Sequence, residues 1–265
     1  MPAELARPGR RKLRLLRHLT WWELVAQYFG SWVGVMWNFV MPALVIGVYL
    51  LVFEFSPKFA FGGWNTVGGY GINLVAALLP WLLFQEGVSR AGRAYIDHRH
   101  LITQVAMPAS LFPLASVTSA LVRHIIGLAI VGTVLAVSGI WTGLHWAGLL
   151  VVLPVLLLLT SACALLAALG TVLHRDVAPT VAAAMLPLFF TTPVIYPPHI
   201  VPAPLRVIMD LNPMSPIVVA YRDLLVTGQS PALSGLLWSA AVATVTAGLA
   251  LLLLRRLGNE LAERL

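Results

Sequence analysis

The sequence predicts an all-α, polytopic membrane protein. Of its 265 residues, 59% are hydrophobic and only 10% are charged, whereas a soluble domain carries about 25% charged residues. The longest charge-free stretch, residues 125–173, contains no Lys, Arg, Asp or Glu. Because one bilayer crossing takes about 20 apolar residues, this stretch accommodates two membrane-crossing helices.

We expect six transmembrane helices in all. The apolar, charge-poor segments are 33–53, 69–84, 111–137, 149–173, 177–195 and 233–254. They form one transmembrane domain over residues 31–265. A cytoplasmic N-terminal region, residues 1–30, precedes it.

Basic residues give the expected orientation. If both termini are cytoplasmic, thirteen of the 17 Lys and Arg residues lie on the inner side and three on the outer side. Cytoplasmic flanks carry such an excess. Six of these residues precede residue 20, a pattern typical of a segment that meets anionic lipids rather than nucleic acid. We expect a multi-pass protein of the cytoplasmic (inner) membrane with both termini inside.

Residues 12–29 have an amphipathic helical pattern. At 100° per residue, Leu15, Leu19 and Trp22 share one stripe, and Arg17 and Glu23 fall opposite. One interpretation is a helix that lies along the inner membrane surface, with Trp at headgroup depth and Arg reaching phosphates. The other is a cytoplasmic extension of the first crossing. The alternation of Arg and Trp around the helix favours the first.

Two segments between crossings predict short helices. The inner segment 97–107 starts with polar residues, continues with Leu101 and Ile102 and is closed by Pro108. Its apolar face is expected to bind a partner protein. The outer segment 197–231 is too rich in proline for one long helix. It predicts a re-entrant pair of short helices between crossings five and six, with an ordinary surface loop as the alternative.

Several common catalytic and metal-binding patterns are absent from the sequence. It has no GxxxxGK[ST] phosphate loop, so we do not expect it to hydrolyse ATP itself. His98 and His100 point to different faces of a helix and have no Cys or second acidic cluster beside them, so we expect no metal site. No pair of carboxylates is expected at membrane depth for acid–base catalysis. We therefore predict neither catalytic residues nor a cofactor in this chain.

Some side chains are candidates for a substrate path. Arg123 lies about a dozen residues into the third crossing, where a charge costs roughly 2.5–3.5 kcal/mol. It either lines a path for an anionic substrate, or snorkels or pairs with a carboxylate of another helix. The aromatic residues form membrane-surface belts or pack against sugar rings. The channel candidates are Tyr28, Phe29, Trp32, Trp37, Arg123, Phe189, Phe190 and Tyr196.

A series of short motifs runs along nearly the whole chain. It comprises GSWVGVMW (30–37) with Pro42, PWLLF (80–84), Leu101-Ile102, Met107-Pro108 with Pro113, HRDV (174–177), PVIY (193–196), Val201-Pro202, Asn212-Pro213 and YRD (221–223). In this order, the series resembles the membrane-spanning subunits of type-2 ABC exporters for O-antigen, capsule or teichoic acid polymers. Arg123-His124 departs from the family, which more often has neutral or acidic residues there.

The resemblance implies a permease subunit that exports a lipid-linked polysaccharide. It implies a homodimer in the lipid bilayer, with two copies of a separate ABC ATPase that bind ATP and Mg²⁺. The helix near 97–107 would couple to the ATPase through Asp97, His98, Arg99, His100, Leu101, Ile102, Met107 and Pro108. The outer re-entrant segment would include Asn212, Pro213, Tyr221, Arg222 and Asp223.

Two other functions are compatible with the sequence. The first keeps the fold and changes the cargo to a drug or a lipid. The second is a polytopic membrane enzyme that acts on lipid-linked sugars, for which Asp210, Arg222 and Asp223 are the nearest candidate catalytic groups.

Overall fold

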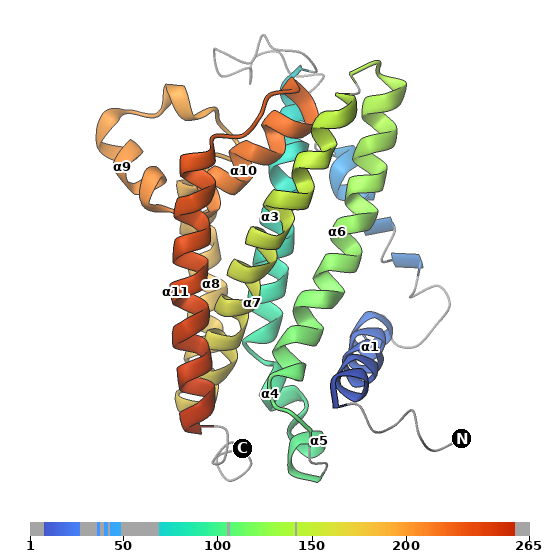
Figure 1. Cartoon of the computed structure of the whole chain (residues 1–265), viewed down its shortest axis with the longest axis vertical. Coiled ribbons are helices and arrows are strands. Elements are labelled where there is room, and N and C mark those ends of the chain that lie inside the picture. The colour runs from blue at the N-terminus through green and yellow to red at the C-terminus, as the bar shows by residue number, and fades with distance from the viewer. Residues whose placement is uncertain are drawn as a thin grey trace.

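The computed structural model describes residues 8–26, 36–37, 40–41, 43–48, 69–104, 107–140 and 142–257. Within these ranges the chain is helical and contains no strand. Four helices of the described part are long and apolar enough to cross a membrane. They stand side by side in Figure 1 and are α3 (Gly69–Ala91), α6 (Leu111–Val137), α7 (Leu149–Leu173) and α11 (Leu233–Leu257).

The helix bounds agree with expectation at α6 and α7 and differ elsewhere. Helix α3 continues to Ala91, although its expected end was residue 84, and α11 continues to Leu257 rather than 254. The expected crossing stopped at residue 84, before the polar residues Gln85 and Glu86. In the structure Glu86 pairs with Arg123 of α6, so the helix keeps a carboxylate whose charge is compensated.

The fifth expected crossing is shorter in the structure. Helix α8 (Val177–Thr191) is apolar but has 15 residues, whereas 177–195 was expected. Thr192 has extended backbone because the ring of Pro193 disfavours the helical conformation in the preceding residue. The expected crossing 33–53 lies mostly outside the described residues, as do Tyr28, Phe29 and Trp32.

Helix α3 is the centre of the bundle. It packs against α6, α7, α8 and α10 (Met214–Arg222), and most of its side chains are buried. Gly87 permits the close approach of α7, because a Cβ atom there would lie 2.8 Å from Cγ2 of Thr160. By contrast, α11 exposes many large apolar side chains along its length, as a lipid-facing helix does.

Short elements cover the two ends of the bundle (Figure 1). At one end, called the α1 end, lie α1 (Pro8–Ala26), α4 (Ala94–Asp97), α5 (Arg99–Gln104) and the last turn of α11. At the opposite end, called the α9 end, lie α9 (Ala203–Leu211) and α10. The remaining short elements are the 3-10 turns η3 (Gly143–Gly148) and η4 (Pro198–Ile200) and the π-helical turn η5 (Asp223–Thr227).

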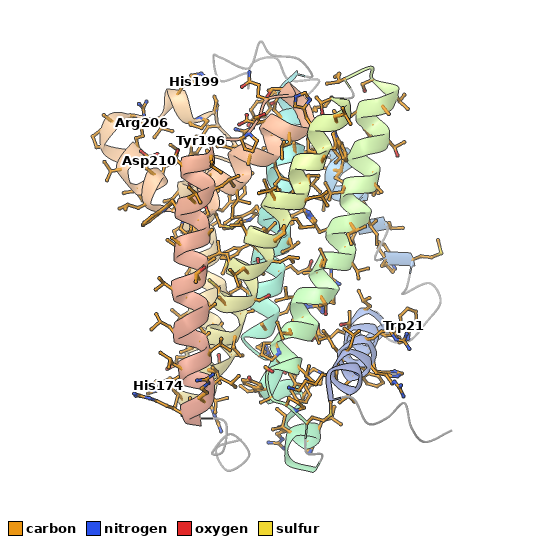
Figure 2. All side chains as sticks on the ribbon, in the orientation of Figure 1. Trp21, His174, Tyr196, His199, Arg206 and Asp210 are labelled. Atoms are coloured by element: carbon orange, nitrogen blue, oxygen red, sulfur yellow. The ribbon has the colours of Figure 1, made fainter. Side chains whose placement is uncertain are left out.

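Helix α1 packs on α6 through a mixed face. Leu19 is buried, and Glu23 accepts a hydrogen bond from Ser116 of α6 at 2.7 Å. Trp21 and Trp22 are exposed, and Figure 2 shows Trp21 pointing away from the bundle. Of the expected stripe, Leu19 is buried and Trp22 is exposed, and hydroxyl groups on α6 bind Glu23 of the opposite face.

Candidate functional site

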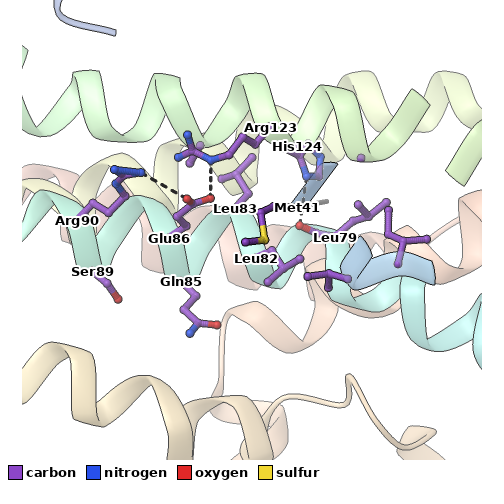
Figure 3. Close-up of a pocket in the computed structure, with 14 residues that line it drawn as sticks. Met41, Leu79, Leu82, Leu83, Gln85, Glu86, Ser89, Arg90, Arg123 and His124 are labelled. Carbon is purple, nitrogen blue, oxygen red and sulfur yellow. Dashed lines mark hydrogen bonds and ion pairs between the residues drawn. The ribbon is translucent and has the colours of Figure 1, made fainter. Parts of the chain in front are cut away.

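A cavity of about 770 Å³ lies between α3, α6 and the residues Met41, Val45 and Ile46. Helix α3 contributes four polar lining residues, Gln85, Glu86, Ser89 and Arg90, from its last turns. One to two turns earlier the same helix contributes leucines (Figure 3). The other lining residues are Met41, Val45, Ile46, Leu79, Leu82, Leu83, Ala120, Arg123, His124 and Gly127.

In the cavity wall, Glu86 lies between two guanidinium groups (Figure 3). Nε of Arg123 donates to Oε2 of Glu86 at 2.8 Å, and Nη1 of Arg90 lies 3.5 Å from Oε1. The side chain of Arg123 is 7% exposed and that of Glu86 is 31% exposed. Arg123 thus pairs with a carboxylate of a neighbouring helix, which is one of the roles considered for it. This ion pair also lines a cavity.

The ion pair continues as a hydrogen-bond network toward α1. Nη2 of Arg123 donates to Oγ of Ser119 at 3.1 Å, and Ser119 donates to Oε2 of Glu23 at 3.4 Å. The other oxygen of Glu23 accepts from Ser116. A network of polar side chains therefore connects α3, α6 and α1. Its hydrogen bonds fix the positions of these helices relative to one another more specifically than apolar packing does.

His124, the residue after Arg123, connects α6 to the α9 end. Its Nδ1 lies 3.2 Å from the carbonyl oxygen of Leu79, which can only accept, so Nδ1 is the donor. Nε2 then accepts from the hydroxyl of Tyr221 on α10 at 2.9 Å. The two rings meet edge to face, with centroids 5.6 Å apart. Arg123 and His124 thus join the cavity to helices at both ends of the bundle.

This contact gives a prediction for Tyr221. Tyr221→Phe leaves Nε2 of His124 buried without a donor, which costs about 1–3 kcal/mol. We expect a lower apparent melting temperature in detergent. Tyr196→Phe is the control, because the Tyr196 hydroxyl donates to the Phe190 carbonyl in an exposed place, and its loss is expected to be smaller. Equal losses in the two variants would contradict the role assigned to the His124 contact.

Residues of the expected outer helix pair fasten α9 and α10 to the end of α8. The buried Arg222 donates to the carbonyl oxygens of Pro193 at 2.8 Å and Val194 at 3.3 Å. Asn212 donates to Oγ1 of Thr192 at 2.8 Å. Its side-chain oxygen accepts from the amide of Met214 at 2.9 Å. Pro213, between Asn212 and Met214, accepts from Ser239 of α11 through its carbonyl at 2.7 Å.

The candidate catalytic groups of the enzyme alternative have different surroundings. Asp210 is exposed on α9, in the group labelled at the α9 end in Figure 2. Arg222 is occupied by backbone carbonyls. Burial raises the pKa of Asp223 to about 6, and the adjacent Arg222 opposes this rise. In the described structure, Arg222 therefore stabilises the backbone at the α9 end.

The structure brings three of the candidate aromatic residues together near the α9 end. The ring of Phe189 lies 5.4 Å from that of Trp81 and 5.6 Å from that of Phe190. Phe190 and Tyr196 line a second cavity, of about 400 Å³, with α9. Trp37 is exposed. Arg123 lies in the other cavity, so the channel candidates do not form a single cluster.

Of the expected inner helix at 97–107, the described residues include the last residue of α4 and the whole of α5. Helix α4 ends at Asp97, α5 begins at Arg99, and His98 separates them. Nδ1 of His98 lies 2.9 Å from the carbonyl oxygen of Ala94, and its ring lies 5.4 Å from that of Phe112. Leu101 is 40% exposed. Arg99 and His100 are also on α5, and Pro108 follows it.

Ile102 and Met107 are only partly accessible, because they pack against an apolar cluster at the α1 end. This cluster joins α1, α4, α6, α7 and α11. Its buried members are Leu19, Ala94, Tyr95, Leu111, Phe112, Ala115, Leu165, Ala168, Leu169, Ala250 and Leu257. Ile102 is therefore less accessible than Leu101. A displacement of α5 would act directly on the helices of the bundle.

The sequence interpretation did not single out Glu86 or the contact of His124 with Tyr221. Glu86 precedes Arg90 by four residues, which is the spacing of an ion pair on one helix face. A central Arg123 also requires a nearby carboxylate. Together these signals favour Glu86 as the partner. The His124 contact joins residues 97 apart in the sequence, and no local pattern indicates it.

In the part of the chain that the structure describes, no three His, Cys, Asp or Glu side chains gather as metal ligands would.

Comparison with known proteins gives one family over most of the chain. The family described as ABC-2 type transporter matches residues 14–226. An O-antigen export system permease protein RfbA of Myxococcus xanthus is 29% identical over 233 residues, 87% of each chain. Two proteins of the same name from Klebsiella pneumoniae are 22% and 21% identical over 207 residues, 78% of each chain. This chain belongs to the ABC-2 type transporter family, as a membrane subunit of a transporter and not as an ATPase.

Proposed function

We propose that this chain is the permease subunit of an ABC exporter that moves a lipid-linked polysaccharide of the O-antigen kind across the cytoplasmic membrane. One observation carries the proposal. The family match and the similarity to an O-antigen export permease extend over most of the chain, 87% in the case of the Myxococcus xanthus protein. The cargo is thus inferred from relatives that this chain matches over 78% to 87% of their length.

The energy for export comes from a separate ABC ATPase, two copies of which bind ATP and Mg²⁺. Helix α5 is the contact with this partner. Leu101 is accessible there, and Ile102 behind it packs against the apolar cluster at the α1 end. An apolar helix face of this kind fits a groove of a partner protein. Movement of the partner is then passed to α6, α7 and α11.

The functional unit is a homodimer with six crossings in each chain. Helix α8 supports this arrangement, because little of it is buried within one chain. Its exposed residues include Ala182, Ala183 and Ala184. Small residues allow close packing of membrane helices, so a second copy is placed against α8. The polymer passes between the two copies, with aromatic rings that contact sugars.

Both termini are cytoplasmic. Helix α1 and the end of α11, with Arg255 and Arg256 in its last turn, lie at the same end of the bundle (Figure 1). The exposed Lys12, Arg14 and Arg17 of α1 favour the anionic inner surface. Helix α1 lies along that surface with Trp21 and Trp22 in the headgroup region. The α9 end is then outside, where α9 and α10 form the re-entrant pair.

Stimulated ATP hydrolysis tests the cargo. The chain and its ATPase partner are reconstituted in liposomes, and hydrolysis is measured with lipid-linked polysaccharide or with hydrophobic drugs. The proposal predicts stimulation by the glycan lipid and delivery of its sugar to the opposite side. Stimulation by drugs alone would replace it with a drug exporter of the same fold.

A further inference from the structure

Pro80 divides helix α3 into two parts. It lies inside the helix and is buried. Proline has no amide hydrogen, so it makes no helical hydrogen bond to the carbonyl of Ala76, and its ring crowds that carbonyl. Sharp bends in helices form mostly at such positions. We call residues 69–79 the first part of α3 and residues 81–91 the second part.

The first part of α3 is fastened to the α9 end of the bundle. The hydroxyl of Tyr70 donates to the carbonyl oxygen of Ile195 at 2.7 Å. The carbonyl oxygen of Leu79 accepts from His124 of α6. The other ring nitrogen of His124 is bound by Tyr221 of α10. Hydrogen bonds near both ends of the first part therefore lead to elements of the α9 end.

The second part of α3 leads to helix α5. Only residues 92–93 separate it from α4, and His98 alone separates α4 from α5. Backbone hydrogen bonds continue through the first of these junctions. The amide of Arg93 donates to the carbonyl of Arg90 at 3.1 Å, and the amide of Asp97 donates to the carbonyl of Arg93 at 3.0 Å. A displacement of α5 is therefore passed along the backbone to the second part of α3.

Two consecutive residues of α6 bind α3 on either side of the break. His124 donates to the carbonyl of Leu79 in the first part, and Arg123 donates to Glu86 in the second part (Figure 3). Leu79 and Glu86 are about two turns apart, at 3.6 residues per turn, so they lie on one face of the helix. Helix α6 therefore fixes the position of one part relative to the other, with Pro80 between the two contacts.

We propose that α3 bends at Pro80 during transport and that His124 is the positioning residue for this bend. Movement of α5 tilts the second part of α3, while the first part keeps its contacts with the α9 end. His124 holds the carbonyl of Leu79, the residue before the break, so the bend forms at Pro80 and does not spread along the first part. The inference rests on the proposed function, because an ATPase bound at α5 supplies the movement.

A distance between two spin labels tests the bend. Labels are attached to cysteines that replace Ile96, exposed on α4, and Leu237, exposed near the start of α11, in a chain with Cys163→Ser. Excess unlabelled chain ensures that one copy in a dimer carries labels. The complex with the ATPase is measured in nanodiscs, without nucleotide and with adenylyl imidodiphosphate. We expect the nucleotide to change the distance. An unchanged distance would overturn the proposal.

Replacing the proline locates the bend. Pro80→Ala restores the missing helical hydrogen bond, and we expect it to abolish the change in distance without lowering the melting temperature. Pro154→Ala is the matched control, because Pro154 also lies inside a helix, α7, but is exposed. This variant is expected to keep the change. A folded Pro80→Ala chain with the full change in distance would contradict a bend at Pro80.

Variants of His124 test its positioning role. His124→Phe keeps a ring and removes both hydrogen bonds. It is expected to shift the nucleotide-free distances toward those with nucleotide, and to lower the sugar exported per ATP hydrolysed about tenfold. His124→Gln is expected to restore most of both, because its amide donates and accepts. A lower melting temperature in His124→Phe, with unchanged distances and unchanged export per ATP, would overturn the positioning role.

The outcome is separate from the cargo question. A nucleotide-dependent change in distance that Pro80→Ala abolishes, in a complex that does not export the glycan lipid, would refute the proposed cargo alone. Export of the glycan lipid without any such change would refute the bend alone.

Discussion

Glu86→Ala is expected to destabilise the protein by about 3 kcal/mol. Removing one partner of a buried pair leaves the other charge uncompensated, at a cost of about 3–5 kcal/mol. The lower value is expected because Glu86 is 31% exposed while Arg123 is 7% exposed. Unfolding by denaturant in detergent micelles measures the change, with the apparent melting temperature as a second probe.

Two further variants isolate the pair. Asp97→Ala removes a carboxylate from an exposed pair with Arg93, 3.8 Å long, and is expected to cost less than about 1 kcal/mol. The double variant Glu86→Ala with Arg123→Leu removes both charges and is expected to recover most of the lost stability. If Glu86→Ala and Asp97→Ala destabilise equally, the pair does not stabilise the contact between α3 and α6.

Leu101→Asp is expected to reduce export at least about tenfold while ATP hydrolysis by the complex continues. Leu101 is 40% exposed on α5, where we place the ATPase. A charge in the apolar centre of an interface costs about 2 kcal/mol or more, which exceeds a tenfold change in equilibrium. Export of labelled glycan lipid and phosphate release are measured in the same proteoliposomes.

The matched control for Leu101→Asp is Leu144→Asp. Leu144 is highly exposed on η3, which immediately precedes α7, and its replacement is expected to leave export unchanged. Ile102→Asp is expected to behave differently from both, because Ile102 packs against the apolar cluster at the α1 end. That variant should lose folded protein as well as export. Normal export in Leu101→Asp would remove α5 from the coupling path.

Apolar length was the most reliable guide to this fold. The bounds of α6 and α7 follow from long apolar segments between turns, because the cost of exposing polar backbone in lipid requires continuous helices. The end of α3 could not be obtained in this way. The helix continues past Glu86, whose carboxylate pairs with Arg123, a residue 37 positions away.

Only those contacts of the candidate site that follow from a single residue or from a short sequence spacing could be predicted from the sequence. A buried Arg123 implies a partner, and Glu86 is spaced to pair with Arg90 on the same helix face. The hydrogen bond between His124 and Tyr221 joins segments that are far apart in the sequence, and so do the contacts of Arg222 with backbone carbonyls. Hydrophobic periodicity is a local pattern and does not predict such contacts. The inward turn of Glu23 likewise depends on hydroxyl groups of α6.

The central claim is that this chain is a transport subunit that is moved by a separate ATPase. Liposomes with the chain alone, and liposomes with the chain and its ATPase partner, are supplied with ATP and lipid-linked polysaccharide. We expect no nucleotide hydrolysis and no translocation by the chain alone, and both activities with the partner present. Hydrolysis by the purified chain, or translocation of the glycan lipid without any ATPase, would contradict it.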